Sequence, residues 1–366
     1  WGIRPPIARA SERRRKGEAM WGSLPTWALV AGFLAASGVI FICGLRMTGL
    51  ADKLADRTGL GEAIVGAVLL GAATSLGGTV VSITAALDGR ASLAFSNSVG
   101  GIAAQTVFLA VADMFYRRIN LEHAGADLGN VFQGLVLIVL LTLPFVAMTT
   151  PEVTVWAVHP VSFVIPLVYG TGLLAGRTVR QSPMWIPTST DETRPDRPEA
   201  EDAASRAEST ARLFLIFALL MLLMGTAGYA IAKIASELSD RMQISETVVG
   251  ALATAVVTSL PELVTTVAAV RRGALQLAIG GIIGGNTFDT LFLVVSDIAY
   301  RDGSLYHAVG DQDYFWIVSA LLMTGILTAG LILRQREGPG KIGVESALLL
   351  LVYAGAVATQ FIVGGT

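Results

Sequence analysis

The sequence predicts an all-α membrane protein with ten transmembrane helices, arranged as two inverted five-helix repeats. Of its 366 residues, 53% are apolar and only 15% are charged, and the mean hydropathy is +0.63. Soluble domains have about 25% charged residues, so this composition indicates a chain that lies in a lipid bilayer. The two further observations behind the prediction are a series of ten apolar segments and a stretch of sequence that occurs twice.

Each apolar segment is long enough to cross a bilayer as a helix, which takes about 20 residues. In chain order, the expected spans are 27–45, 61–87, 92–116, 131–149, 155–176, 211–234, 246–270, 275–299, 313–334 and 343–363. The residues between the fifth and sixth spans are rich in proline, serine and charged side chains, which indicates a polar linker. The expected organisation is an N-terminal tail (1–26), a first repeat (27–176), the linker (177–210) and a second repeat (211–366).

The distribution of basic residues predicts the orientation. Five spans per half give the two halves opposite directions in the membrane, so the repeat has inverted topology. Loops after the odd-numbered spans carry most of the arginine and lysine, and positively charged loops stay in the cytoplasm. Both termini are therefore expected outside a bacterial inner membrane. The basic run 13–16 contradicts this orientation, and because Met20 directly precedes the first span, we expect residues 1–19 not to belong to the native protein.

The stretch that occurs twice starts within the second and the seventh spans. Thr74-Ser75-Leu76-Gly77-Gly78 aligns with Thr258-Ser259-Leu260-Pro261-Glu262, and the alignment continues without a gap as far as Tyr116-Arg117 and Tyr300-Arg301. A repeat that carries a buried carboxylate is typical of membrane transporters whose site lies where the two repeats meet.

In the second repeat, Glu262 lies in the middle of a span, where a charge costs about 2.5–3.5 kcal/mol on insertion scales and is usually functional. Pro261 removes a backbone donor and breaks the helix, which frees carbonyl oxygens nearby. Thr258 lies on the same helix face as Glu262, and Ser259 is adjacent. Such oxygen ligands suit Na⁺, Ca²⁺ or Mg²⁺. A protonated, purely structural Glu262 is the alternative.

The next span carries a second carboxylate on a stripe of small residues. Gly281, Gly285 and Asp289 recur every four residues, and small residues let helices approach closely. The stripe is therefore expected to bring Asp289 against the span that contains Glu262. A glycine packing seam explains the glycines but not an aspartate within the membrane.

These motifs resemble a known family. Thr-Ser-Leu-Pro-Glu-Leu at 258–263 and Gly-Gly-Asn-Thr-Phe-Asp at 284–289 are similar to the second α-repeat of the cation/calcium antiporter superfamily, which includes the sodium/calcium exchangers. The ten spans, the odd-numbered repeat and the linker after span five also match this family. The resemblance implies that spans one and six slide against the others. The ion ligands that it implies in the second repeat are Thr258, Ser259, Glu262, Asp289 and the carbonyl oxygen of Ala255.

The first repeat departs from the family pattern. Gly77-Gly78 replaces the usual Pro-Glu, and Gln105 stands at the position that matches Asp289. We expect the two glycines to loosen the helix, so that it breaks as in the second repeat, and Gly78 to leave space for water or another substrate group. The site then receives two carboxylates from one repeat and neutral oxygens from the other. The neutral donors expected from the first repeat are Thr74, Ser75, Gln105 and the carbonyl oxygen of Gly71.

Charged residues near the span ends are expected to be structural. Asp113 and Asp297 lie four residues before Arg117 and Arg301, a spacing that predicts ion pairs along the helix. Lys233 is expected to extend its amine towards the membrane surface. His123, His159 and His307 lie in loops or at span ends, where we expect no metal site.

Three functions remain open. The first is a secondary active antiporter of sodium/calcium exchanger type, with alternating access at a midplane site. Losing one carboxylate weakens a divalent ion more than a monovalent ion, which favours the second function, a monovalent-cation or proton-coupled exchanger of the same fold. The third is a non-transporting sensor or partner subunit. No enzyme motif occurs, so neither catalysis nor a cofactor is expected, and the expected partners are inorganic cations and lipid, not nucleic acid.

Overall fold

The computed structural model describes residues 20–58, 62–116, 118–194, 209–338 and 342–364, without the side chains of 51–53, 55–58, 62–73 and 363–364. The described chain is helical and contains no β-strand. The expectation for residues 1–19 lies outside the described residues.

The helices coincide with the expected spans. In the first half they are α2 (Thr26–Thr58), α3 (Glu62–Leu87), α4 (Ala91–Asp113), the short α5 (Leu121–Ala124), α6 (Leu128–Thr149) and α7 (Val161–Gln181). In the second half they are α9 (Thr210–Met242), α10 (Glu246–Val248), the π-helical turn η1 (Val249–Thr254), α11 (Ala255–Thr258), α12 (Leu260–Arg272), α13 (Leu275–Ala299), the short η2 (Leu305–His307), α14 (Asp311–Leu333) and α15 (Val344–Gly364).

The helices confirm a multi-span membrane protein. Within the described residues, eight helices are long and apolar enough to cross a membrane, or nine if the bent pair Glu246–Thr258 and Leu260–Arg272 counts as one span. Of α3, only Thr74–Leu87 is described with its side chains. The count of ten and the inverted topology therefore stay predictions.

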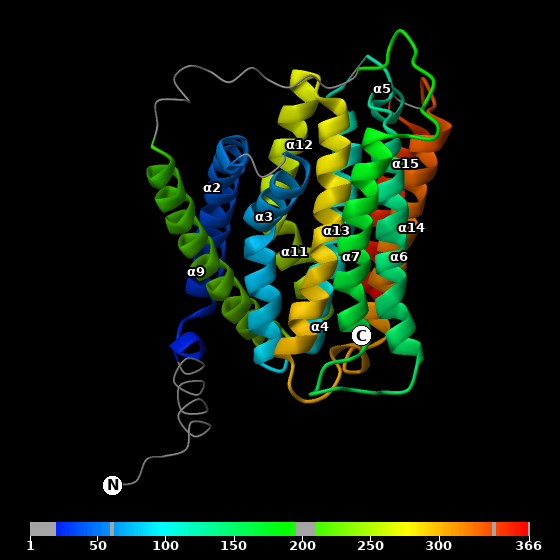
Figure 1. The fold of residues 1–366 in the computed structure, drawn as a ribbon. Helices are drawn as coiled ribbons and strands as arrows, with labels where there is room; N and C mark the ends of the chain where they lie inside the picture. The colour runs from blue at the N-terminus through cyan, green and yellow to red at the C-terminus, as the bar shows by residue number, and fades with distance from the viewer. Residues whose placement is uncertain (1–19, 59–61, 117, 195–208, 339–341, 365–366) are drawn as a thin grey trace.

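Helices α4 and α13 form the centre of the bundle (Figure 1). The apolar part of α4 is 94% buried, whereas those of α2 and α9 are each 33% buried. Helices α2 and α9 pack against each other along one side of the molecule, and α6, α7, α14 and α15 lie on the other side (Figure 1). The centre is therefore the part of the bundle best shielded from lipid.

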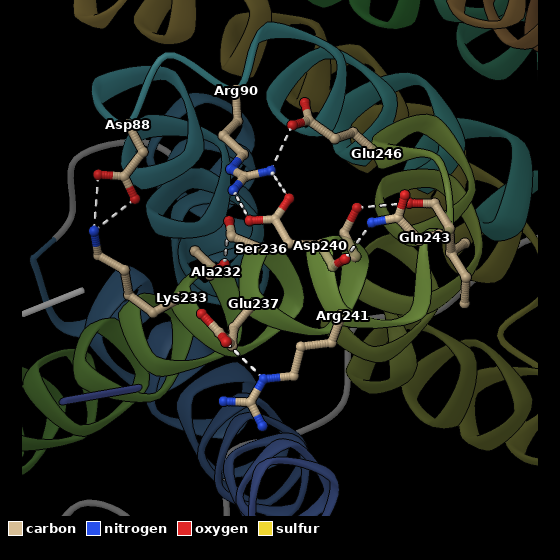
Figure 2. Close-up of polar contacts among 12 residues, drawn as sticks. Asp88, Arg90, Ala232, Lys233, Ser236, Glu237, Asp240, Arg241, Gln243 and Glu246 are labelled. Atoms are coloured by element: carbon tan, nitrogen blue, oxygen red, sulfur yellow. Dashed lines mark hydrogen bonds and ion pairs between the residues drawn. The ribbon is translucent and has the colours of Figure 1, made fainter. Parts of the chain in front are cut away.

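Ion pairs connect α9 to the turn between α3 and α4 (Figure 2). The Lys233 amine lies 2.6 Å from the Asp88 carboxylate, and these side chains are 10% and 15% exposed. Arg90 binds Asp240 of α9 and also Glu246 of α10, the latter at 2.8 Å. Asp88 lies in the turn that follows α3, so the ion pair is a finding that the sequence did not predict, and the extension of Lys233 towards the membrane surface stays a prediction.

The aspartates at the ends of α4 and α13 bind backbone amides. Oδ1 of Asp113 accepts a hydrogen bond from the Leu121 amide at 2.9 Å, and Oδ1 of Asp297 accepts one from the Leu305 amide at 2.8 Å. The predicted ion pair between Asp297 and Arg301 is wrong, because the Arg301 guanidinium donates to the Ile298 carbonyl instead. The corresponding pair with Arg117 lies outside the described residues. The two repeats therefore also share the contacts at the ends of α4 and α13, up to Leu121 and Leu305.

Residues 177–181 of the predicted linker are the last turn of α7, and residues 182–194 lie over α5 (Figure 1). The Arg194 amide donates to the Ala124 carbonyl at 2.9 Å, and the His123 ring nitrogen Nε2 lies 3.2 Å from the Thr190 hydroxyl. This polar segment is therefore attached to the end of the bundle.

Candidate functional site

The second repeat contains the predicted helix break. Between α11 and α12 the chain bends by 46°, and Ser259, at the bend, has φ −97° and ψ 2°. Pro261 follows in the first turn of α12. Proline has no amide hydrogen, so the Val257 carbonyl four residues earlier loses its helical partner. The break therefore has the local cause expected from the sequence.

The first repeat contains no such break. Helix α3 continues without interruption through Gly77-Gly78, so the expectation of a second broken helix is wrong. Glycine lowers helix propensity but keeps its amide donor, and the hydrogen-bond ladder survives. The glycines serve close packing instead, since a Cβ at Gly77 would lie 3.0 Å from Ile40 of α2.

Asp289 lies at the centre of the site and is held by the first repeat. The Ser75 hydroxyl donates to its Oδ1 at 2.7 Å, and the Gln105 amide nitrogen donates to its Oδ2 at 2.7 Å. The same amide nitrogen lies 3.2 Å from the Ser259 hydroxyl. All four side chains are at most 4% exposed. The structure thus brings together four of the predicted site residues, two from each repeat.

This ring is built from matching positions of the two repeats. Gln105 and Asp289 are 184 residues apart, and Ser75 and Ser259 have the same separation. Where a Cβ at Gly101 would stand, Ser259 Oγ would be 3.6 Å away and Asp289 Oδ2 3.7 Å. The glycine stripes of α4 and α13 therefore let the polar side chains meet, as their spacing predicts.

Glu262 lies beside this ring, 6% exposed. The Thr74 side chain hydrogen-bonds to its carboxylate, and the Asp289 carboxylate is close enough to repel it. Its Oε2 and the Gln105 carbonyl oxygen Oε1 receive no hydrogen bond from any described residue. Two buried acceptor oxygens without donors fit a cation or a proton, because unsatisfied buried oxygens are costly.

The remaining predicted ligands lie nearby but are engaged in the helix. The Thr258 hydroxyl donates to the carbonyls of Thr254 at 2.9 Å and Ala255 at 3.2 Å, and the Ala255 carbonyl also accepts from the Ser259 amide at 3.1 Å. The surroundings of Gly71 lie outside the described residues. Ligand roles for Ala255, Thr258 and Gly71 therefore stay predictions.

A phenylalanine fills the space beside Gly78, so the expectation of free space there is wrong. A Cβ at this position would lie 2.7 Å from the Phe292 ring and 3.5 Å from the Thr258 hydroxyl oxygen. Position 78 therefore faces the site. The Phe292 ring of α13 lies beside it, whereas the matching position of the second repeat carries the carboxylate of Glu262.

Asn97 connects three helical segments, a role that the motifs did not predict. Its amide nitrogen donates to the Gly78 carbonyl at 3.1 Å and to the Ser82 hydroxyl at 2.9 Å, and its Oδ1 accepts from the Thr254 hydroxyl at 2.7 Å. Asn97 thus ties α4 to α3 and to the π-turn of the broken helix. Asn97, Gly101 and Gln105 recur every four residues on one face of α4, and this spacing is the signal that could have identified it.

The carboxylates do not form a conventional metal cluster. Among the described residues, no group of three or more histidine, cysteine, aspartate or glutamate side chains is placed to hold a metal ion. A cation bound here would rely on hydroxyl, amide and backbone oxygens in addition to Glu262 and Asp289. Such a mixed oxygen set is typical of alkali and alkaline-earth ions.

Both halves of the chain match one known protein family. The sodium/calcium exchanger protein family matches residues 28–175 and 212–362, which are the two halves without the linker. Inner membrane protein YrbG of Escherichia coli (strain K12) is 35% identical over 111 residues, covering 30% of this chain and 33% of that protein. The aligned part thus spans about a third of the curated relative.

Solved structures share the fold. The crystal structure of the H⁺/Ca²⁺ exchanger CAX has a TM-score of 0.63 at 14% identity, covering 92% of this chain and 86% of that one. Native YfkE gives 0.62 at 12% identity, covering 92% and 93%. The sodium–calcium exchanger NCX_Mj, soaked with 2.5 mM Na⁺ and 10 mM Sr²⁺, gives 0.59 at 16%, covering 92% and 99%.

Proposed function

The chain belongs to the sodium/calcium exchanger protein family, and from this premise we propose that it is a secondary active cation antiporter with a single site between its repeats. The observation that carries the proposal is the pair of buried carboxylates, Glu262 and Asp289, beside a helix break and within a ring of hydroxyl and amide groups. Among the described residues no lysine or arginine neutralises this pair, so a bound cation or proton has to do so.

Antiport follows if both transported cations bind the same oxygen ligands. Two cations that use the same carboxylates compete for one site, so one leaves as the other enters. Ten spans of inverted topology, with both termini outside a bacterial inner membrane, provide two access routes of similar shape. The lipid-facing α2 and α9 slide along the buried core, and the ion pairs of Asp88 with Lys233 and of Arg90 with Asp240 have to rearrange when they do (Figure 2).

A monovalent-cation or proton-coupled exchanger is the second candidate, and the Phe292 ring favours it. At the position that matches Glu262, the first repeat has Gly78, and the Phe292 ring of α13 lies beside it. Calcium takes 6–8 oxygen ligands, and its affinity rises with their charge. A site with carboxylates from one repeat only is better suited to Na⁺ or H⁺.

Flux measurements in liposomes test the proposal. In the wild type, we expect an imposed sodium or pH gradient to drive the movement of radiolabelled calcium or sodium across the liposome membrane. Glu262→Gln should abolish this flux because it removes one of the two site charges, whereas Glu237→Gln, at the far end of α9, should retain it. Calcium movement driven by sodium supports the sodium/calcium type, and sodium movement without calcium supports the second candidate. A wild type that moves no cation would contradict both and leave a sensor or partner subunit.

A further inference from the structure

The end of the molecule that carries the linker holds a second group of buried acids. Asp113 ends α4, Glu122 lies in α5 and Glu345 lies in the first turn of α15 (Figure 1). Asp113 and Glu122 are fully buried, and Glu345 is 4% exposed. None of them belongs to the candidate ion site. Three carboxyl groups buried together need partners or protons.

Two of these acids have hydrogen-bond donors and one has none. Asp113 accepts from the backbone amides of Leu121 at 2.9 Å and Gly343 at 3.0 Å, and Glu345 accepts from the Asn120 side chain. Neither oxygen of Glu122 receives a hydrogen bond from a described residue. The carboxylates of Asp113 and Glu345 are close enough to Glu122 to repel a negative charge on it. A buried carboxyl group without donors and beside two other acids favours its protonated form.

The opposite end of the bundle has the same scaffold without the extra acids. Asp297 accepts from the backbone amides of Leu305 and His159, each at 2.8 Å, and from the Ser162 hydroxyl at 2.7 Å. The Tyr306 hydroxyl lies 2.9 Å from that of Ser162.

The repeat offset of 184 residues pairs Glu122 with Tyr306 and Glu345 with Val161. The scaffold therefore forms with a phenol and an isopropyl group in place of two carboxyl groups. The extra acids are not needed to build it, which indicates that they add a property of their own.

Charged groups on the neighbouring elements do not neutralise Glu122. The Arg334 guanidinium, at the end of α14, binds the carbonyls of Thr188 and His123, and Arg336 pairs with Glu192 of the linker. Arg194 binds the Asp191 carbonyl. Burial, followed by repulsion from Asp113 and Glu345, raises the pKa of Glu122 well above its ordinary value.

Helix α5 is also the anchor of the linker. The Arg194 amide binds the Ala124 carbonyl, and His123 Nε2 lies 3.2 Å from the Thr190 hydroxyl. Nδ1 of His123 lies 2.6 Å from the Arg334 carbonyl. A change in the position of α5 therefore reaches the linker through the two residues that follow Glu122.

We propose that Glu122 holds a proton and that this proton keeps α5, and with it the linker segment 182–194, against the core. When the proton leaves to solvent, the Glu122 carboxylate faces those of Asp113 and Glu345, and their repulsion drives α5 outward. The linker segment then loses its contacts with His123 and Ala124.

The sign of the pH effect follows from linkage. The folded protein keeps the proton to a higher pH than the unfolded chain, in which Glu122 titrates near 4.3. Stability from this proton is complete below that value and decreases as the pH rises towards the pKa of the folded state. In this window the folded-to-unfolded ratio falls about tenfold per pH unit for one proton.

The test compares the full chain in detergent at acid and alkaline pH, using thermal unfolding and hydrogen exchange of segment 182–194. The quantity compared is the protection factor, the exchange rate of an unstructured chain divided by that of the segment at the same pH. In the wild type, we expect high protection at acid pH and low protection at alkaline pH. Glu122→Gln mimics the protonated group and should keep high protection at both. Glu122→Tyr, which copies the opposite end, should also remove the pH dependence. Tyr306→Phe, at that end, should leave it unchanged.

Several outcomes would overturn the proposal. A protection factor in the wild type that does not vary with pH is one, and an unchanged pH dependence of protection in Glu122→Gln is another. If added sodium or calcium chloride restores high protection at alkaline pH where choline chloride does not, the ligand is a metal cation and not a proton. If Glu122→Gln fails to fold, Glu122→Tyr is the test: loss of the pH dependence supports the proposal, and an unchanged pH dependence overturns it.

Discussion

Restoring the missing carboxylate should shift the site towards divalent ions. The change is Gly78→Glu, the position that matches Glu262 in the other repeat. A Cβ there would lie 2.7 Å from the Phe292 ring and 3.5 Å from the Thr258 hydroxyl oxygen, so the new side chain enters the site but collides with the ring. Overpacking of this kind costs about 1–3 kcal/mol. The variant to test is therefore Gly78→Glu with Phe292→Ala.

Coulomb's law gives the size of the expected shift. At about 4 Å and an effective dielectric constant of about 20, a new carboxylate attracts Na⁺ by about 4 kcal/mol and a divalent ion by about twice as much. The cost of burying the carboxylate is common to both ions and cancels in their comparison. The remaining difference of about 4 kcal/mol is an upper limit and corresponds to a shift of up to about a thousandfold in calcium-to-sodium preference.

Calorimetric titration with CaCl₂ and NaCl, together with calcium flux in liposomes, measures this shift. Gly78→Gln with Phe292→Ala is the matched control, since it has the same shape and no charge. Removing the ring alone costs about 3–5 kcal/mol in a packed core, so thermal unfolding has to show that both double variants are folded. Equal calcium-to-sodium preference in the two double variants would refute the reasoning that position 78 lines the ion site.

Four further predictions test individual contacts. Gly100→Ala should destabilise the fold strongly, because a Cβ there would lie 2.5 Å from the Ala251 backbone, whereas Gly284→Ala at the matching position meets nothing within 4 Å and should unfold like the wild type. Asp88→Asn should lower the unfolding free energy by about 1–3 kcal/mol, since Lys233 loses a mostly buried partner, and Glu237→Gln at a more exposed pair by less than about 1 kcal/mol. Burial, and then repulsion from His307, lowers the pKa of His159, so the stability that comes from its neutral ring is lost as the pH falls from about 7 to 5. His159→Asn should therefore reduce the acid sensitivity of the melting temperature. An acid sensitivity equal to that of the wild type would contradict this role of His159. Ser75→Ala removes the 2.7 Å donor of Asp289 and should change cation affinity by about tenfold; calorimetry that finds no change would exclude Ser75 from the site.

Hydropathy and the repeat predicted most of the fold. Each of the ten expected spans coincides with a helix, or with the broken pair at Glu246–Arg272. The ends were less accurate: α2 continues to Thr58 and α9 to Met242, because a helix can extend through polar residues that hydropathy reads as loop. The break at Pro261 was predictable since proline lacks a donor, and the absence of one at Gly77-Gly78 was not, since glycine permits either outcome.

The site was predictable where the repeat constrained it and not where packing decided. Matching positions placed Ser75, Gln105, Ser259 and Asp289 together, and the structure confirms that they meet. The direction of the Phe292 ring depends on how α13 packs on α3, which no local pattern contains. The pairing of Lys233 with Asp88 joins residues 145 apart, a distance at which charge patterns along one helix carry no information.

The repeat also shows what Gln105 does. If the first repeat had an aspartate there, its carboxylate would face that of Asp289 across the centre of the site, and a cation or proton would have to separate the two charges. The Gln105 amide instead donates to Asp289 Oδ2 at 2.7 Å and to the Ser259 hydroxyl at 3.2 Å. The amide hydrogens therefore take a place that a bound cation would fill in a symmetric site. Together with the ring beside Gly78, this removes negative charge from both positions that the first repeat contributes. The remaining charge lies on Glu262 and Asp289, and it is enough for one divalent or two monovalent charges. For this reason we expect any choice between calcium and sodium to depend on the asymmetry between the repeats and not on the fold that they share.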